Sequence, residues 1–440
     1  MPWLDNSTGI WTGVYLGGAP NYSAGKAGEV YISKSDIEIL RKLANELALL
    51  ASRESEDKKR KLWYEHNELK NKYPVIFADP ENGWNEIITA DMIECRGDLA
   101  RRWEVVLRKE IFYGRDMKDD KPLERVFEIG YTYIDTEWGV KEEYQGGKEG
   151  HSYKWEAAIK KEEDIKKIHN PEIIIDYRTT LETLGLASDV FKDLLGVKLR
   201  GVFWHGFAYS WDLSKFVGLQ DMMILMYDKP ELIHRLMKII LDGYMAKIDY
   251  LESQNLLTLN NDNFYVGSGG LGFTTELPKR DLDGKPVGPQ DLWCHTESQE
   301  TVGVSPQMFE EFIYQYQLPL QKRFGLNCYG CCEALEDRWP IIKKAPNLRR
   351  VSVSQWADKA RMAELLEDKY IYSAKPSPTD LALFQMNEDA ARKRLREILE
   401  VSKGCIVELL MKDNHTLGGN PQNITRWVEI AREEIARVYG

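Results

Sequence analysis

The sequence predicts an α/β protein, a (β/α)8 TIM barrel with an N-terminal helical extension and a β-hairpin insertion. From residue 74 onward, short runs rich in β-branched and aromatic residues alternate with amphipathic helical segments. This alternation is typical of a parallel sheet, because only a crossover returns a strand in the same direction. About eight such units fit in the rest of the 440-residue chain, and that number favours a closed barrel over an open sheet.

The first 70 residues are predicted to lie outside the barrel. Residues 1–32 are rich in Gly, Tyr and Trp without periodicity, and we interpret them as an arm or lid. Ser33 or Ser35 can cap the helix that follows, in which four leucines recur at spacings of three and four: Leu40, Leu43, Leu47 and Leu50. The charged segment 52–72 is predicted to continue as a second helix with a solvated face.

The barrel is expected to occupy residues 71–440. Its predicted strands are 74–79, 199–206, 256–262, 292–296, 326–331, 348–354, 370–375 and 405–411. Two stretches interrupt the alternation, namely a β-hairpin near 128–158 and a long loop near 263–291. Within that loop, residues 267–272 read G-x-G-x-x-G, but no helix follows, so we interpret them as a flexible loop or lid and not as a nucleotide site.

Composition excludes several classes of function. The chain has 59 basic and 70 acidic side chains, and the net charge of −11 argues against binding nucleic acid or an anionic membrane. No apolar run approaches the length of a membrane span, and the amino end does not resemble a signal peptide. Six cysteines are too few for a disulfide scaffold, so a reducing, cytoplasmic location is expected.

Candidate site residues follow from one property of such barrels: catalytic groups lie at the carboxyl ends of the strands and on the loops that follow. The predicted catalytic residues are Glu297, His295, Asp413 and His415. The predicted substrate-binding residues are His205, Asn261, Asp262, Tyr329, Lys375 and Lys412.

A cysteine cluster at one strand end suggests a metal site. Three of the six cysteines lie within 328–332, and thiolates are soft ligands that suit zinc. The candidate zinc ligands are Glu297, Cys331, Cys332 and His295. Two alternatives stay open: the cysteines act as small buried hydrophobes, and the His295–Glu297 pair is a structural hydrogen-bonded pair. The H-x-E and C-x-x-C elements also resemble zinc deaminases, but here they lie on strands and not at helix starts.

Several segments carry a family resemblance. They read LWYEHNELKNKYPVIF, RGVFWHGFAYSWDLSKFVGLQDMMILMYDKPELIHRLM, ESQETVGVSPQMFEEFI, YGCCEALEDRW and NPQNITRWVEIAREEI. From about residue 60 onward, the chain resembles the uroporphyrinogen decarboxylase superfamily, and most closely its corrinoid- and zinc-dependent methyltransferase branch (O-demethylase or methylamine type). The resemblance implies a (β/α)8 barrel and a zinc ion held by a carboxylate, a His-x-Cys element and a late cysteine.

This sequence departs from the pattern at two of those ligands. Tyr329-Gly330-Cys331 stands in place of His-x-Cys, which keeps the cysteine and loses the histidine. The late cysteine is also missing, because Cys405 lies at the start of its strand and the strand ends at 411–413 as Met-Lys-Asp.

Three functions are therefore expected, in this order. The first is transfer of a methyl group from a small methylated donor, a methoxy-aromatic compound or a methylamine, to the Co(I) of a separate corrinoid protein, a reaction of anaerobic one-carbon metabolism. The second is metal-independent decarboxylation of an aromatic or pyrrolic carboxylate held by Lys375, Lys412 or His205. The third is a non-catalytic barrel that binds a small molecule or carries another subunit. A homodimer is expected, as the commonest assembly.

Overall fold

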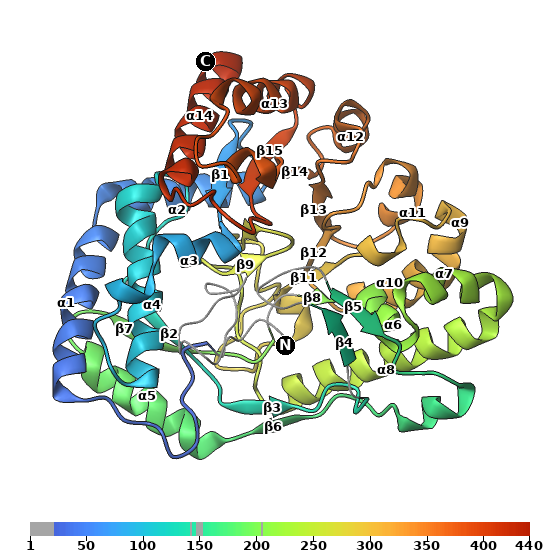
Figure 1. The fold of residues 1–440 in the computed structure, drawn as a ribbon, viewed down its shortest axis with the longest axis horizontal. Coiled ribbons are helices and arrows are strands. Elements are labelled where there is room, and N and C mark those ends of the chain that lie inside the picture. The colour runs from blue at the N-terminus through green and yellow to red at the C-terminus, as the bar shows by residue number, and fades with distance from the viewer. Residues whose placement is uncertain (1–21, 141–142, 147–152, 204–205) are drawn as a thin grey trace.

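A parallel sheet of seven strands forms the centre of the protein. The computed structural model describes residues 22–440 apart from 141–142, 147–152 and 204–205 (Figure 1). The strand order is β1-β15-β14-β13-β12-β11-β8, and every neighbouring pair is parallel. The strands are β1 Val75–Ala78, β15 Ile406–Met411, β14 Ile371–Ala374, β13 Leu348–Val353, β12 Leu326–Tyr329, β11 Trp293–Thr296 and β8 Gly206–Phe207. The predicted α/β class with a parallel sheet is confirmed.

Strand pairing within the described residues does not close this sheet into the predicted barrel. Two further strands, β2 (Val126–Gly130) and β7 (Gly196–Arg200), form a separate parallel pair. The predicted strand 256–262 is irregular, and the Asn260 side chain takes the place of a ladder by bonding the backbone N–H and C=O of Trp293 at 2.9 and 3.1 Å. The predicted strand 199–206 is divided between β7 and β8.

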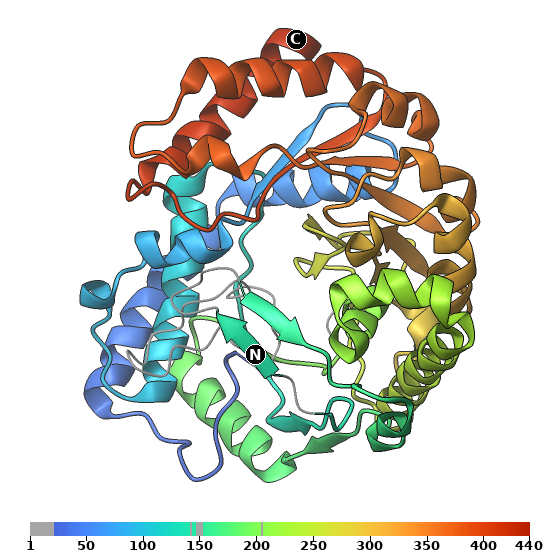
Figure 2. The same cartoon turned by 45° about the vertical axis from the view of Figure 1, so that its right-hand side comes forward.

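Helices cover the outer face of the sheet, as Figures 1 and 2 show. Residues that alternate toward this face contact them: the Tyr372 hydroxyl donates to the carbonyl of Lys359 at 3.1 Å. The longer helices are α4 Asp98–Phe112, α5 Tyr177–Phe191, α6 Tyr209–Val217, α7 Leu219–Asp228, α8 Pro230–Ser253, α10 Gln315–Gln321, α12 Lys359–Leu366, α13 Glu388–Val401 and α14 Gln422–Tyr439. The short ones are α3 Trp84–Ile87, α9 Pro306–Phe309 and α11 Trp339–Ile342. No helix in the described residues is long and apolar enough to cross a membrane.

The two N-terminal helices pack on the rest of the protein. Helix α1 (Lys34–Ala51) is capped by the Ser33 hydroxyl, which accepts from the N–H of Asp36 at 3.1 Å, and its four predicted leucines are buried. Helix α2 (Glu54–Asn67) has the predicted exposed, charged face, and it also has a buried face that was not predicted. Its buried side chains are Glu56, Trp63, His66 and Asn67, which recur at helical spacing and form one face.

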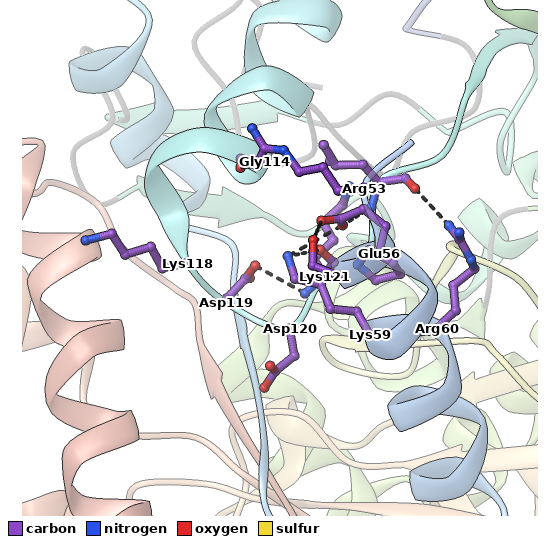
Figure 3. Close-up of polar contacts among 12 residues, drawn as sticks. Arg53, Glu56, Lys59, Arg60, Gly114, Lys118, Asp119, Asp120 and Lys121 are labelled. Atoms are coloured by element: carbon purple, nitrogen blue, oxygen red, sulfur yellow. Dashed lines mark hydrogen bonds and ion pairs between the residues drawn. The ribbon is translucent and has the colours of Figure 1, made fainter. Parts of the chain in front are cut away.

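Polar contacts attach α2 to the segment that leads into β2 (Figure 3). The Glu56 carboxylate accepts from the N–H of Leu123 at 2.9 Å, and Lys59 Nζ donates to the carbonyl of Lys121 at 3.1 Å. The Asp120 carboxylate accepts from the N–H of Ile76 in β1 at 2.8 Å. The charges of this helix therefore satisfy backbone groups of its neighbours.

The glycine-rich segment 267–272 was predicted to be a flexible loop or lid. In the structure it lies on the inner face of the sheet. It forms a small hairpin of β9 (Tyr265–Val266) and β10 (Gly270–Leu271), which Figure 1 shows near the centre of the molecule. Six side chains form a separate apolar cluster there: Phe264, Val266, Leu277, Trp293, Leu326 and Cys328. A Cβ at Gly270 would overlap the guanidinium of Arg350, so glycine permits the hairpin to approach β13 closely. Because these residues are buried, the segment is part of the core.

The insertion predicted at 128–158 begins later than expected. Its first residues belong to β2, which pairs with β7. A hairpin does follow, with β4 (Glu143–Gly146) antiparallel to β5 (Tyr153–Glu156). Strands β3 (Tyr133–Asp135) and β6 (Ile173–Ile175) form another antiparallel pair.

Candidate active site at the carboxyl edge of the sheet

Three predicted site residues directly follow the strands of the sheet. Glu297 follows β11, Lys375 follows β14 and Lys412 follows β15, each one residue beyond its strand. All three side chains are buried. Because parallel strands end at the same edge, the sheet brings these groups to one level.

Cys331 and Cys332 lie together just beyond β12. Gly330 has a φ of +90°, which ends the strand and turns the chain. The two sulfur atoms are 3.6 Å apart, and Cys332 Sγ lies 3.8 Å from Asp413 Oδ2. The hydrogen bond from Cys332 and the positive charge of Lys412 lower the pKa of the Cys331 thiol, whereas the same pairing raises the pKa of Cys332.

Three glutamates lie close together beyond β11 and β12. Glu333 accepts hydrogen bonds from the N–H groups of Ser298 and Cys331, each at 2.8 Å. Glu297 Oε2 accepts from the N–H of Gln299 at 2.8 Å, while Glu297 Oε1 is buried without a hydrogen-bond partner among the described residues. Burial, followed by the charges of Glu300 and Glu333, raises the pKa of Glu297 well above its ordinary value. Its environment therefore favours the protonated form of Glu297 more than water would.

His295 is neutral and held in one orientation. Its Nε2 lies 3.0 Å from the carbonyl oxygen of Gly330, so this nitrogen carries a proton and donates it. Burial lowers the pKa of His295 to about 4, and the positive charges of Lys375, Lys412 and Arg350 act in the same direction. The side chain is thus a hydrogen-bond donor at neutral pH and not a cation.

The two lysines differ in their partners. Lys412 Nζ lies 3.5 Å from Glu81 Oε1 and 3.4 Å from Asp413 Oδ1, and these carboxylates hold the pKa of Lys412 above its ordinary value despite burial. Lys375 Nζ has no hydrogen-bond partner in the part of the chain that the structure describes. Burial and the charge of Lys412 lower the pKa of Lys375.

Other predicted site residues are not brought to this cluster. The Tyr329 hydroxyl donates to Gln317 Oε1 at 2.8 Å on the helix side of the sheet, because alternate residues of β12 face opposite ways. Asn261 Nδ2 donates to the carbonyl of Leu277 at 2.7 Å and holds the long loop. Asp262 pairs with Lys198 and Arg200. His415 is exposed, and His205 lies outside the described residues.

Several site residues were missed by sequence reasoning. Ser268, at the tip of the buried hairpin, donates to Cys331 Sγ at 3.2 Å. Glu300 accepts from the Ser210 hydroxyl at 2.6 Å. Ser268 had no signal, since its segment read as a lid, but Glu300 lies four residues after the end of β11 and could have been included. Glu81, which the strand-end rule does select, contacts Lys412.

The residues implied as zinc ligands do not fit a zinc site as they are placed. No group of three His, Cys, Asp or Glu side chains among the described residues could hold a metal ion. His295 Nε2 is directed to the Gly330 carbonyl. Among the four predicted ligands, Cys331 and Cys332 contact each other through their sulfur atoms.

The loop after β15 contains residues with the spacing of a known cofactor motif, but their contacts show a structural role. Residues 413–418 read D-x-H-x-x-G, the spacing of a cobalamin-binding motif. Here the carboxylate of Glu86 accepts from Thr416 Oγ1 at 2.6 Å and from the N–H groups of Leu417 and Gly419 at 2.9 and 2.8 Å. Leu417 is fully buried, so these residues fix the loop between β15 and α14. We assign no corrinoid site to it.

Comparison with known proteins adds little. No family model matches the chain, and no curated protein matches it. Among solved structures, the chain is similar to a methyltransferase from Methanosarcina mazei at 11% sequence identity and a TM-score of 0.39. The match covers 71% of this chain and 81% of the other. No functional argument rests on a likeness this weak.

Proposed function

We propose that this protein is a methyltransferase that moves a methyl group from a small methylated donor to the Co(I) of a corrinoid carried by a separate protein. The observation that supports the proposal best is the buried Glu297, whose pKa is raised by burial and whose Oε1 has no partner among the described residues. The resemblance of the sequence to corrinoid-dependent methyltransferases supplies the reaction class.

The chemistry needs such an acid. An ether or amine is a poor leaving group unless its oxygen or nitrogen gains a proton as the bond to the methyl carbon breaks. Glu297 donates that proton from Oε1, and the methyl group passes to the acceptor without its bonding electron pair. The demethylated product leaves as an alcohol, phenol or amine. His295 does not supply this proton, because the N–H of its neutral ring is donated to the carbonyl of Gly330.

The fold is proposed to be a (β/α)8 barrel. In this view β2, β7 and residues 256–260 complete the ring between β1 and β11, with hydrogen bonds through Asn260 in place of a regular ladder. A barrel would place the acid, the lysines and the cysteines around one opening, where a docked partner could reach the donor.

A second candidate is decarboxylation of an aromatic or pyrrolic carboxylate without a metal. The observation that favours it is the buried ammonium of Lys375, which has no partner among the described residues and could hold a carboxylate. Glu297 would then protonate the carbon from which carbon dioxide leaves.

The test is an assay of methyl transfer from methoxy-aromatic compounds and methylamines to a Co(I) corrinoid. The transfer is monitored by the change in the absorption spectrum of the corrinoid. We expect transfer by the native protein and a fall in kcat of about 10²- to 10⁴-fold in Glu297→Gln, because an amide cannot donate an acidic proton. The rate of the native protein should also fall as pH rises through the raised pKa of Glu297.

The matched control is Glu364→Gln on α12, whose side chain is 67% exposed. It should transfer methyl groups at the native rate. An unchanged rate in Glu297→Gln would refute the role of Glu297. Release of carbon dioxide from a carboxylated substrate without corrinoid would favour the second candidate.

A further inference from the structure

Lys375 occupies a position where a structural lysine is not expected. It directly follows β14, and its N–H continues the sheet by donating to the carbonyl of Val353 in β13 at 2.9 Å. Lys375 alternates onto the same face as Ser373, which is the register partner of the inward-facing Glu408 in β15. Its side chain therefore enters the inner face of the sheet at the carboxyl edge and is only 5% exposed.

The surroundings of Lys375 supply charge but no direct partner. Lys412, on the adjacent strand, is occupied by Glu81 and Asp413. Glu408 is occupied by Arg350 and His66, at 2.9 and 3.2 Å. The Lys375 ammonium is thus left without a hydrogen-bond acceptor among the described residues.

An unpaired ammonium in this environment is unstable. Burying a polar group without a hydrogen bond costs free energy, and burying a charge without a partner costs more. A lysine with only a structural role would either pair with a carboxylate or extend its amine to solvent. An anion that arrives with the substrate would supply the missing acceptor.

We propose that Lys375 is a binding subsite for a carboxylate of the substrate, so that the donor is a small methylated carboxylic acid. The methyl group of this donor rests on the proposed function, whereas its carboxylate group is inferred from Lys375 alone. Glu297 and Lys375 follow strands β11 and β14, which are separated by β12 and β13. A substrate that contacts both residues would have its carboxylate at the end near Lys375 and its reacting methyl-bearing atom at the end near Glu297.

The charges around Lys375 favour a carboxylate over a phosphate. A phosphate dianion is commonly held by several donors, such as arginine forks or the N–H groups of a helix terminus. Lys375 offers one ammonium without a partner among the described residues, because the neighbouring Lys412 already contacts Glu81 and Asp413. One ammonium matches a single negative charge.

The test measures binding and needs neither corrinoid nor turnover. The probes are acetate, benzoate and 4-methoxybenzoate, each paired with its neutral amide, titrated calorimetrically into the full-length protein. We expect at least one carboxylate to bind about 10-fold or more tightly than its amide. Lys375→Met should remove that preference and leave amide binding unchanged. The control Lys369→Met replaces a lysine with a 67% exposed side chain and should bind as the native protein does.

Thermal denaturation guards against a folding defect. Because Met fills the same space without an unpaired ammonium, unliganded Lys375→Met should melt at or above the native temperature. The proposal is overturned if Lys375→Met binds the carboxylates as tightly as the native protein, if no carboxylate of the series binds, or if the unliganded variant melts lower. Methyl transfer is assayed separately, so carboxylate binding without transfer would refute only the proposed reaction.

Discussion

Removing the charge of Glu408 should strongly destabilise the protein. The carboxylate lies on the inner face of β15 between Arg350 Nε at 2.9 Å and His66 Nε2 at 3.2 Å, and all three side chains are fully or almost fully buried. The variant Glu408→Gln keeps the shape but leaves the guanidinium of Arg350 without a counter-charge. His66 would also lose its acceptor.

The magnitude follows from the pKa of Glu408. Burial alone would raise it, but the charge of Arg350 and the hydrogen bond from His66 lower it to about 2, from an ordinary value of 4.5. This lowering of the pKa corresponds to about 3 kcal/mol of stability at neutral pH. Loss of one partner from a buried ion pair costs about 3–5 kcal/mol, which agrees.

The measurement is the free energy of unfolding in urea, compared between the native protein and Glu408→Gln over a range of pH. A lowered pKa stabilises the fold fully above pH 4.5, and this stability is lost as pH falls toward 2. The difference between the two proteins should therefore be about 3 kcal/mol at pH 7 and about 2 kcal/mol at pH 3.5. The double variant Arg350→Met with Glu408→Met should lose much less, because it leaves no unpaired charge. A difference near zero at pH 7, or one that does not change with pH, would refute this reasoning.

Two further predictions concern the inner hairpin and the cysteines. Gly270→Ala should destabilise the protein by about 1–3 kcal/mol in the same unfolding assay, because its Cβ would overlap the Arg350 guanidinium. The control Gly185→Ala in α5 has open space around its Cβ and should be neutral or stabilising; equal effects would contradict the close approach. In alkylation followed by peptide mass spectrometry, Cys331 should react at lower pH than an ordinary thiol and before Cys332, because its pKa is lowered. Cys328, which is 2% exposed and has a pKa raised by burial to about 11, should stay unmodified, and faster reaction of Cys332 would contradict the assignment.

The regular part of the fold could be predicted from sequence because its signals are local. The cap at Ser33 and the leucine spacing of α1 are contained in one helix, and both are confirmed. Alternation of strands and helices likewise predicts a parallel sheet without knowledge of its neighbours. Strand β2 was missed because the hairpin that follows it dominates the pattern of residues 128–158.

The parts that failed depend on distant partners. The exposed face of α2 could be predicted, but its buried face could not, because Glu56 and Lys59 bond backbone groups far along the chain. The glycine-rich segment has no periodicity, so nothing local showed that it packs against Arg350. In the site, strand-end position selected both Lys375 and Lys412. It could not show that, among the described residues, Lys412 has carboxylate partners and Lys375 has none.

The buried hairpin constrains the order in which the protein can assemble. Its contacts include Arg350 in β13 and Leu410 in β15, which both come later in the chain than the hairpin itself. The hairpin therefore completes its packing only after these later strands have been synthesised. A circular permutant that begins near residue 280 would reverse that order, because its ribosome would make the hairpin after the strands that it contacts.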